Sequence, residues 1–120
     1  MRVNTLKISV DAAVASFCNE GWAQLAPDAF VMEFLEQRGD KRRAFAIDRH
    51  LFDVLVFPAG TDLHDHHMVA SGELRLQDKA SCMPPHVLSG GGAIPLRIAL
   101  DPCAAPGGKT THLSALMGGV

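Results

Sequence analysis

A loop rich in proline and glycine near the carboxyl end has the clearest chemical potential in the chain. Residues 101–110 read Asp-Pro-Cys-Ala-Ala-Pro-Gly-Gly-Lys-Thr. Small side chains let backbone N–H groups approach a ligand closely, and a helix that starts here adds partial positive charge at its amino end. Carboxylate and phosphate groups both bind at such places. The loop therefore predicts a binding site for an anionic group of a small molecule.

Two alternatives exist for this loop. A Walker A phosphate-binding loop has the pattern G-x-x-x-x-G-K-[ST], and Gly108, Lys109 and Thr110 fit its end. Its first glycine, however, falls on Cys103, and Pro106 stiffens a turn that has to be wide to wrap a phosphate. ATP and GTP are therefore disfavoured. The second alternative is a turn whose glycines serve packing alone.

The loop needs a strand before it and a helix after it. Leu96-Arg-Ile-Ala-Leu-Asp reads as a buried strand, and Leu113, Leu116 and Met117 recur at the spacing of one helix face. Strand, loop and helix in this order open a parallel α/β unit, whose next strand lies about thirty residues further along. The sequence reaches only Val120, so we expect this unit to be truncated.

The preceding residues predict a separate, smaller domain of mixed helices and strands. Periodicity, caps and turn residues indicate a strand over 2–7, a helix after Ser9 up to Gly21 and a helix from Pro27 to Gly39. Two strands are expected within 44–57, followed by a His-rich turn over 62–71 and a strand over 73–78. A short helix is expected around 80–88, and Pro84 and Pro85 interrupt or begin it. Ser89-Gly-Gly-Gly favours a flexible connection. We therefore predict a domain over 1–89, a linker at 90–92 and a second domain from residue 93.

Composition limits the class of protein. The chain has 120 residues, 48% of them hydrophobic and 20% charged, which suits one ordinary domain or two small ones with a core. A formal net charge of −2 excludes a strongly basic domain that binds nucleic acid through phosphate contacts alone. Because the sequence has no apolar run of membrane-spanning length and no signal-peptide pattern, we expect a soluble intracellular protein.

The cysteines do not predict a disulfide framework or a metal site. Cys18, Cys82 and Cys103 include no C-x-x-C pair, so we expect reduced thiols, with Cys18 in the core on the apolar face of a helix. Cys82 and His86 have i,i+4 spacing, but the two prolines between them disfavour a metal pair.

A run of histidines offers the other candidate metal ligands. His64, Asp65, His66 and His67 carry donors that suit zinc or copper. Adjacent side chains rarely face one ion, however. A solvated surface turn is the favoured interpretation, and we predict no metal site.

Basic residues gather in one segment of this acidic chain. A twelve-residue segment contains five basic residues and only two acidic ones, Asp40 and Asp48. The basic residues are Arg38, Lys41, Arg42, Arg43 and Arg49. They predict phosphate contacts with RNA whose affinity falls as salt rises, and an exposed charged loop is an equal alternative. Trp22 is the aromatic residue to test for base stacking, because most of the six phenylalanines fall at core-facing positions.

Three separated motifs together resemble the Sun/RsmB-type RNA (cytosine-5) methyltransferases. The loop at 101–110 resembles motif I of that family, and residues 2–7 resemble the strand that opens its small RNA-binding domain. Residues 76–81 resemble the motif that leads into its catalytic domain. Phe57-Pro-Ala-Gly-Thr-Asp-Leu-His-Asp-His further resembles the eukaryotic branch that acts on large-subunit ribosomal RNA. The resemblance covers most of the chain and is weakest over 22–43.

The resemblance implies a fold, a cofactor and a product. The fold is an α+β accessory domain of RNA-recognition type followed by the first strand, loop and helix of a Rossmann-like α/β methyltransferase core. S-adenosylmethionine is expected to bind, mainly through backbone donors toward its methionine end, at Cys103, Ala104, Ala105, Pro106, Gly107, Gly108 and Lys109. The product is 5-methylcytosine in ribosomal RNA, and the implied location is the nucleolus.

Methyl transfer to carbon 5 of cytosine also requires a cysteine that first adds to carbon 6. The family resembled has that cysteine in motifs that lie beyond Val120, so we predict no catalytic residue in this chain and no activity of the chain alone. Cys103 lies where the cofactor is expected and is disfavoured as the nucleophile. The alternative function is a noncatalytic RNA-binding or regulatory module.

Overall fold

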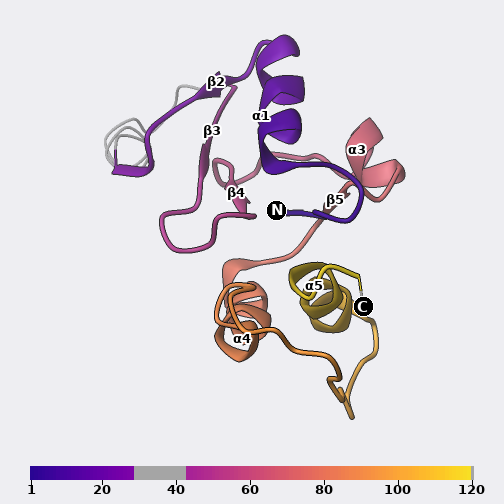
Figure 1. The fold of residues 1–120 in the computed structure, drawn as a ribbon. Helices are drawn as coiled ribbons and strands as arrows, with labels where there is room; N and C mark the ends of the chain where they lie inside the picture. The colour runs from indigo at the N-terminus through magenta and orange to yellow at the C-terminus, as the bar shows by residue number, and fades with distance from the viewer. Residues whose placement is uncertain (29–42, 120) are drawn as a thin grey trace.

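A computed structural model describes residues 1–28 and 43–119 of the chain (Figure 1). Its strands are β1 (Arg2–Val3), β2 (Ala23–Gln24), β3 (Ala44–Ile47), β4 (Leu55–Val56) and β5 (Leu74–Arg75). Its helices are α1 (Val10–Asn19), α3 (His67–Ala70), α4 (Lys79–Ser89) and α5 (Gly108–Leu116). The helix expected over 27–39 lies outside the described residues except for positions 27 and 28, which are helical.

Short strands from distant parts of the chain pair with one another. β1 pairs antiparallel with β5, β2 pairs parallel with β3, and β3 pairs antiparallel with β4. Arg2 also bridges Val54, and the Val3 N–H donates to the Asp53 carbonyl at 2.8 Å, so β1 lies beside the segment that leads into β4. The mixed α+β architecture expected here is confirmed, although the strands expected over 2–7 and 73–78 are only two residues long and β2 was not expected.

Helix α1 packs on the strands through Ala13 and Phe17, both fully buried. Ser9 caps the helix as expected, because its hydroxyl accepts from the Ala12 N–H at 3.1 Å. The expectation that Cys18 lies in the core is wrong. Cys18 follows Phe17 around the helix, on the side that faces solvent, and is exposed.

Helix α4 runs unbroken through Pro84 and Pro85, so the expected interruption does not occur. Proline at position 85 removes the hydrogen bond that the Ser81 carbonyl would accept in a regular helix. The side-chain amide of Gln77 donates to that carbonyl instead, at 3.0 Å. Asp78 caps the start of the helix by accepting from the Ser81 N–H at 2.8 Å. The helix therefore tolerates proline because a side chain outside it replaces the missing donor.

The three glycines after α4 end it in a hydrogen-bonded turn. All three have positive φ, between 57° and 88°, a conformation that favours glycine. The Gly91 N–H donates to the His86 carbonyl at 2.8 Å, and the Ile94 N–H donates to the Ser89 carbonyl at 2.9 Å. The chain therefore turns sharply where a linker was predicted.

The segment before the loop does not form the strand expected over 96–101. Ile98 and Leu100 are 90% and 89% exposed, where a buried strand was predicted. A parallel strand is stable only when it pairs with neighbours, and within 1–28 and 43–119 no strand lies beside this segment. Helix α5 does form after the loop, and it packs against α4, as Figure 1 shows in orange and yellow.

None of the helices in the described part of the chain is long and apolar enough to cross a membrane.

Candidate functional site

The loop and the motif at 76–81 line one pocket of about 330 Å³. Leu76, Gln77, Asp78 and Ser81 form one side of it. The other side includes every residue expected to contact a cofactor except Gly107. Two motifs that the sequence analysis singled out separately thus meet in space. Their role in binding a cofactor stays a prediction.

The loop owes its shape to a glycine and an aspartate. Gly107 has a φ of 98° and precedes α5, whose amino end no side chain caps. The first N–H groups of a helix lack partners within it, so those of α5 are available to a ligand. Asp101 fastens the loop by accepting from the Cys103 N–H at 3.0 Å and from the Thr110 hydroxyl at 2.6 Å. The Thr110 and Cys103 hydrogen bonds lower the pKa of Asp101, so it is a carboxylate at neutral pH.

An acidic and a basic side chain line the pocket. Hydrogen bonds from the Ser81 N–H and hydroxyl lower the pKa of Asp78, and the Lys109 charge adds to this effect. Asp78 and Lys109 come from the two opposite motifs. An anion and a cation that line one pocket suit a ligand with both an ammonium and a carboxylate group.

Cys103 lines the same pocket and is exposed, and its backbone N–H donates to Asp101 at 3.0 Å. His112, the nearest histidine in the sequence, donates from Nε2 to Asp53 Oδ2 at 2.8 Å. That Cys103 is no nucleophile stays a prediction.

Behind the pocket lies a carboxylate between two imidazoles, which we call the buried cluster: Asp53, His86 and His112. His86 Nε2 lies 2.7 Å from Asp53 Oδ1, and His112 Nε2 lies 2.8 Å from Asp53 Oδ2. Asp53 and His112 are fully buried, and His86 is 7% exposed. Burial alone would raise the pKa of Asp53, but the hydrogen bonds from His112 and His86 outweigh it and lower that pKa.

The buried cluster joins three parts of the chain. Asp53 precedes β4, His86 belongs to α4 and His112 belongs to α5. Burial lowers the pKa of His112 although its bond to Asp53 opposes the effect, so the ring is neutral at pH 7. The sequence carries no signal for this cluster, because His86 and His112 stand 33 and 59 residues from Asp53 and share no characteristic spacing with it.

A buried arginine lies beside this cluster. Arg2 is 1% exposed, and its Nε donates to Gln77 Oε1 at 3.1 Å. Its Nη2 donates to the Thr111 hydroxyl of α5 at 3.0 Å. Arg2 was expected on a strand, and no motif in the sequence marks it as a candidate site residue.

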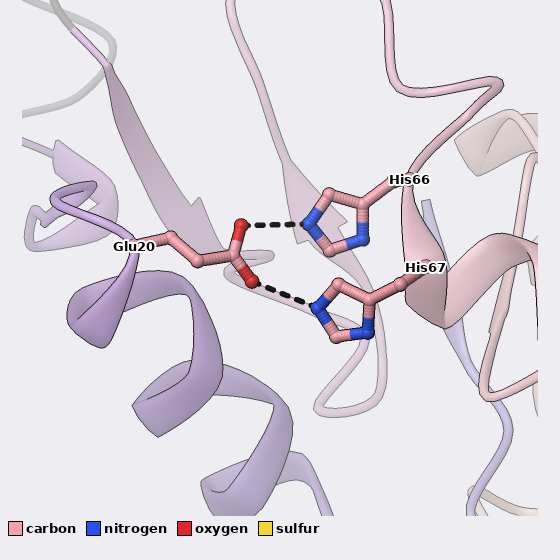
Figure 2. Close-up of side chains that lie close together, drawn as sticks. All are labelled: Glu20, His66 and His67. Atoms are coloured by element: carbon pink, nitrogen blue, oxygen red, sulfur yellow. Dashed lines mark hydrogen bonds and ion pairs between the residues drawn. The ribbon is translucent and has the colours of Figure 1, made fainter.

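The His-rich turn forms a second cluster of the same kind, which we call the surface cluster: Glu20, His66 and His67. Figure 2 shows both imidazoles facing the Glu20 carboxylate at the end of α1, with Nε2–oxygen distances of 2.8 Å for His66 and 3.0 Å for His67. Burial favours the neutral acid, but bonds from both histidines lower the pKa of Glu20.

The expectation of a fully solvated turn is therefore wrong for His66. Its side chain is only 10% exposed, because it stacks on Phe17 with ring centroids 4.9 Å apart. His66 Nδ1 accepts from the Met68 N–H at 3.3 Å, so the neutral ring bears its proton on Nε2 and donates it to Glu20. His64 lies elsewhere, bonded to Asp62 at 2.9 Å, and does not join the cluster.

Of the basic residues proposed for RNA, Arg38, Lys41 and Arg42 lie outside the described residues. Arg43, just before β3, lies 6.0 Å from the centre of the Trp22 ring. Arg49, beyond the other end of β3, pairs with Asp28 at 3.2 Å. RNA contacts by these side chains stay a prediction.

Comparison with known proteins gives matches along most of the chain. Residues 1–77 match the family described as NOL1/NOP2/Sun domain family member 5, ferredoxin-like domain. The 28S rRNA (cytosine-C(5))-methyltransferase of Mus musculus is 40% identical over 117 residues, which are 98% of this chain and 24% of the mouse protein.

Two further relatives come from a plant and a bacterium. The 25S rRNA (cytosine-C(5))-methyltransferase NSUN5 of Arabidopsis thaliana is 39% identical over 119 residues, 99% of this chain and 17% of that protein. Ribosomal RNA small subunit methyltransferase F of Cronobacter sakazakii is 39% identical over 117 residues, 98% of this chain and 21% of that protein. The chain thus spans at most about a quarter of the length of these relatives.

Proposed function

The chain belongs to the family of NOL1/NOP2/Sun domain family member 5 proteins, and we propose that it is the RNA-docking and cofactor-binding part of an rRNA (cytosine-5) methyltransferase. Residues 1–77 are its ferredoxin-like domain. The names of the relatives from mouse and Arabidopsis support ribosomal RNA as the substrate and 5-methylcytosine as the product. By the same resemblance, we place the protein in the nucleolus.

The proposed domain organisation follows the order of the elements. Residues 1–89 form the accessory domain, 90–92 the connection, and 93–120 the start of a Rossmann-like core. The segment 96–101, where the resemblance places the first strand of that core, forms no strand in this structure. Its exposed Ile98 and Leu100 are the side chains that neighbouring strands of a parallel sheet would bury.

The cofactor proposed for the pocket is S-adenosylmethionine, which supplies an electrophilic methyl group on its sulfonium when bound. Residues 103–109 hold its methionine end. The N–H groups at the start of α5 bind the carboxylate, and Lys109 adds positive charge there. Asp78, ionised on the facing wall, suits the ammonium group.

No residue of this chain is proposed as the nucleophile. Carbon 5 of cytosine becomes reactive only after a thiolate adds to carbon 6, and the exposed Cys103 belongs to the cofactor pocket. The roles proposed for this chain are therefore RNA binding by the accessory domain and cofactor binding by the loop.

One observation supports this proposal above all: the loop and the motif at 76–81, predicted separately, line the same pocket. Calorimetric titration of the chain with S-adenosylmethionine tests it. Gly107→Ala strains a backbone whose φ is 98°, at about 1 kcal/mol or more, and we expect it to weaken binding at least tenfold.

Gly21→Ala is the matched control. Gly21 has a φ of 85°, and a Cβ at either glycine meets nothing within 4 Å, so both changes act through the backbone. Gly21→Ala should leave cofactor affinity unchanged. Equal effects of the two variants, or no binding heat from the unchanged chain, would contradict the proposal.

Binding to labelled ribosomal RNA, measured at several salt concentrations, separates this function from the noncatalytic alternative. RNA binding without cofactor heat favours a regulatory module. RNA binding together with cofactor heat favours the methyltransferase assignment.

A further inference from the structure

A buried polar junction joins the ferredoxin-like domain to the helix that follows the cofactor loop. We propose that Asp53 and Arg2 are positioning residues for the cofactor site, because they hold α5, and through it the loop, in place. This inference rests on the proposed function in so far as the ligand is S-adenosylmethionine. Neither residue lines the pocket, so both act through other side chains.

Asp53 fixes α5 by using both of its carboxylate oxygens. Oδ2 bonds His112 of α5 at 2.8 Å, while Oδ1 bonds His86 of α4 at 2.7 Å. The carboxylate cannot turn toward one ring without losing the other. Because Asp53 and His112 are fully buried, water cannot take the place of the lost partner. A shift of α5 therefore leaves one oxygen of a buried carboxylate without a partner.

Arg2 connects a residue that lines the pocket to helix α5. Its Nε donates to Gln77, which lines one wall, and its Nη2 donates to the Thr111 hydroxyl of α5. That hydroxyl in turn donates to the Gly107 carbonyl at 2.7 Å. A chain of two hydrogen bonds thus runs from a buried guanidinium to the glycine that shapes the loop.

The hydrogen bonds of Asp53 and Arg2 restrict how α5 can move on α4. Apolar contacts between α4 and α5 are not directional and allow the helices to slide. Hydrogen bonds to charged groups are directional and strong when buried. Together Asp53 and Arg2 fasten two adjacent residues of α5, Thr111 and His112, and so fix its rotation and its position along the axis.

A metal ion is the alternative occupant of the buried cluster. Its ligand atoms all lie within 4.8 Å of one another, and two imidazoles with a carboxylate suit zinc. A His112 that binds metal through Nε2 must carry its proton on Nδ1, and metal-bound imidazoles normally donate that proton. His112 Nδ1 is buried without a hydrogen-bond partner among the described residues. A buried N–H without a partner is costlier than a free acceptor, so direct hydrogen bonds to Asp53 are favoured.

Amide hydrogen exchange of the 120-residue chain tests the proposal without relying on cofactor binding. We expect Asp53→Asn to speed exchange in α5 at least tenfold more than in α1 and β3. In parallel, its affinity for S-adenosylmethionine should fall at least fivefold. Asp62→Asn is the matched control, because Asp62 bonds a histidine at 2.9 Å on the surface and should change neither measurement.

Variants of α5 separate positioning from general stability. His112→Gln keeps an N–H donor for Asp53 and should retain most of the protection, whereas His112→Leu should lose it. Thr111→Val removes only the hydroxyl between Arg2 and Gly107, at an exposed position that tolerates the change. It should weaken cofactor binding while α1 stays protected.

Three results would overturn the inference. Asp53→Asn could speed exchange equally in α1, β3 and α5, which would make Asp53 a general stabiliser. It could leave α5 unchanged. Zinc chloride added alone could bind one ion per chain and protect α5, with both effects lost in Asp53→Asn, which would make the cluster a metal site. Exchange in α5 could change as expected while the unchanged chain gives no heat with S-adenosylmethionine. The proposed function would then be wrong, but Asp53 and Arg2 would still be shown to position α5.

Discussion

The surface cluster and the buried cluster have the same chemistry in different surroundings. Each places one carboxylate between two imidazoles, with Nε2–oxygen distances between 2.7 and 3.0 Å. The His67 ring is 66% exposed, whereas the Asp53 carboxylate is completely buried. Water can replace a bond in the first cluster but not in the second. Burial, not bond length, therefore decides how firmly each cluster holds its elements.

The largest expected difference concerns stability. Asp53→Ala leaves two imidazole donors without partners in the interior, and we expect it to lower the free energy of unfolding by about 3 kcal/mol. Glu20→Ala, its counterpart in the surface cluster, should cost less than about 1 kcal/mol because water solvates the freed rings. Urea unfolding followed by circular dichroism measures both. Equal losses would show that burial does not distinguish the clusters.

The second difference concerns pH. Because burial lowers the pKa of His112 in the folded chain, the unfolded chain takes up a proton near pH 6.5 that the folded chain does not. Stability should therefore fall as pH drops from about 6.5 to 5, by at most about 1.4 kcal/mol per pH unit. The charged groups that influence His112 are Asp53 and Arg2, with His86 as the third titratable neighbour.

His112→Gln should remove this part of the pH dependence. Glu20, in contrast, has a lowered pKa in the folded chain. Its contribution to the free energy of unfolding is therefore fully present above the pKa of about 4.3 that glutamate has in the unfolded chain, and it is lost only below that pH. Urea midpoints at each pH provide the test. A pH slope that is the same in His112→Gln as in the unchanged chain would assign it to other groups.

The third expected difference, a smaller one, is in how fast the cysteine thiols react. Burial raises the pKa of Cys82 to about 11, and Cys82 packs with Leu51 and Val54 next to the buried cluster. Cys18 and Cys103 are exposed. An aromatic disulfide reagent should modify these two quickly and Cys82 at least tenfold more slowly. Asp53→Asn should speed the Cys82 reaction, and the control Asp62→Asn should not.

The smallest effect expected is that of salt on the surface cluster. In about 1 M salt the screening length is about 3 Å, so the electrostatic interactions of the Glu20 carboxylate with the two imidazoles weaken. The loss caused by Glu20→Ala should shrink by a few tenths of a kcal/mol, while the loss caused by Asp53→Ala stays the same. Unfolding curves at low and high salt check this, and a large salt effect on the Asp53 variant would mean that water reaches the buried cluster.

Local sequence signals predicted local structure. The family resemblance inferred from three motifs is confirmed by the match over residues 1–77. Helix α1 with its Ser9 cap, strands β3 and β4, and helix α5 after the loop were predicted because neighbouring residues determine them. Helix α3 was missed, since its cap is the His66 ring, which is rarely used as a cap.

Contacts between distant residues could not be predicted in the same way. The bond from Arg2 to Thr111 joins residues 109 positions apart, and nothing near either residue marks it. The segment 96–101 shows the opposite failure: its apolar pattern predicts a strand, but pairing depends on neighbours that lie outside the pattern. Only the residues that the loop contributes to the pocket were predicted. The residues from 76–81 line it because the chain folds back on itself, and the sequence pattern does not show this.

The bond between the first strand and the last helix matters for protein engineering. A chimaera that crosses over at the glycine turn would join residues 1–89 of one relative to the later part of another. Arg2 would then meet a foreign partner at position 111, and Asp53 one at position 112. Exchange between relatives should therefore move these four positions as a matched set, even though a junction at the glycines looks natural from the sequence.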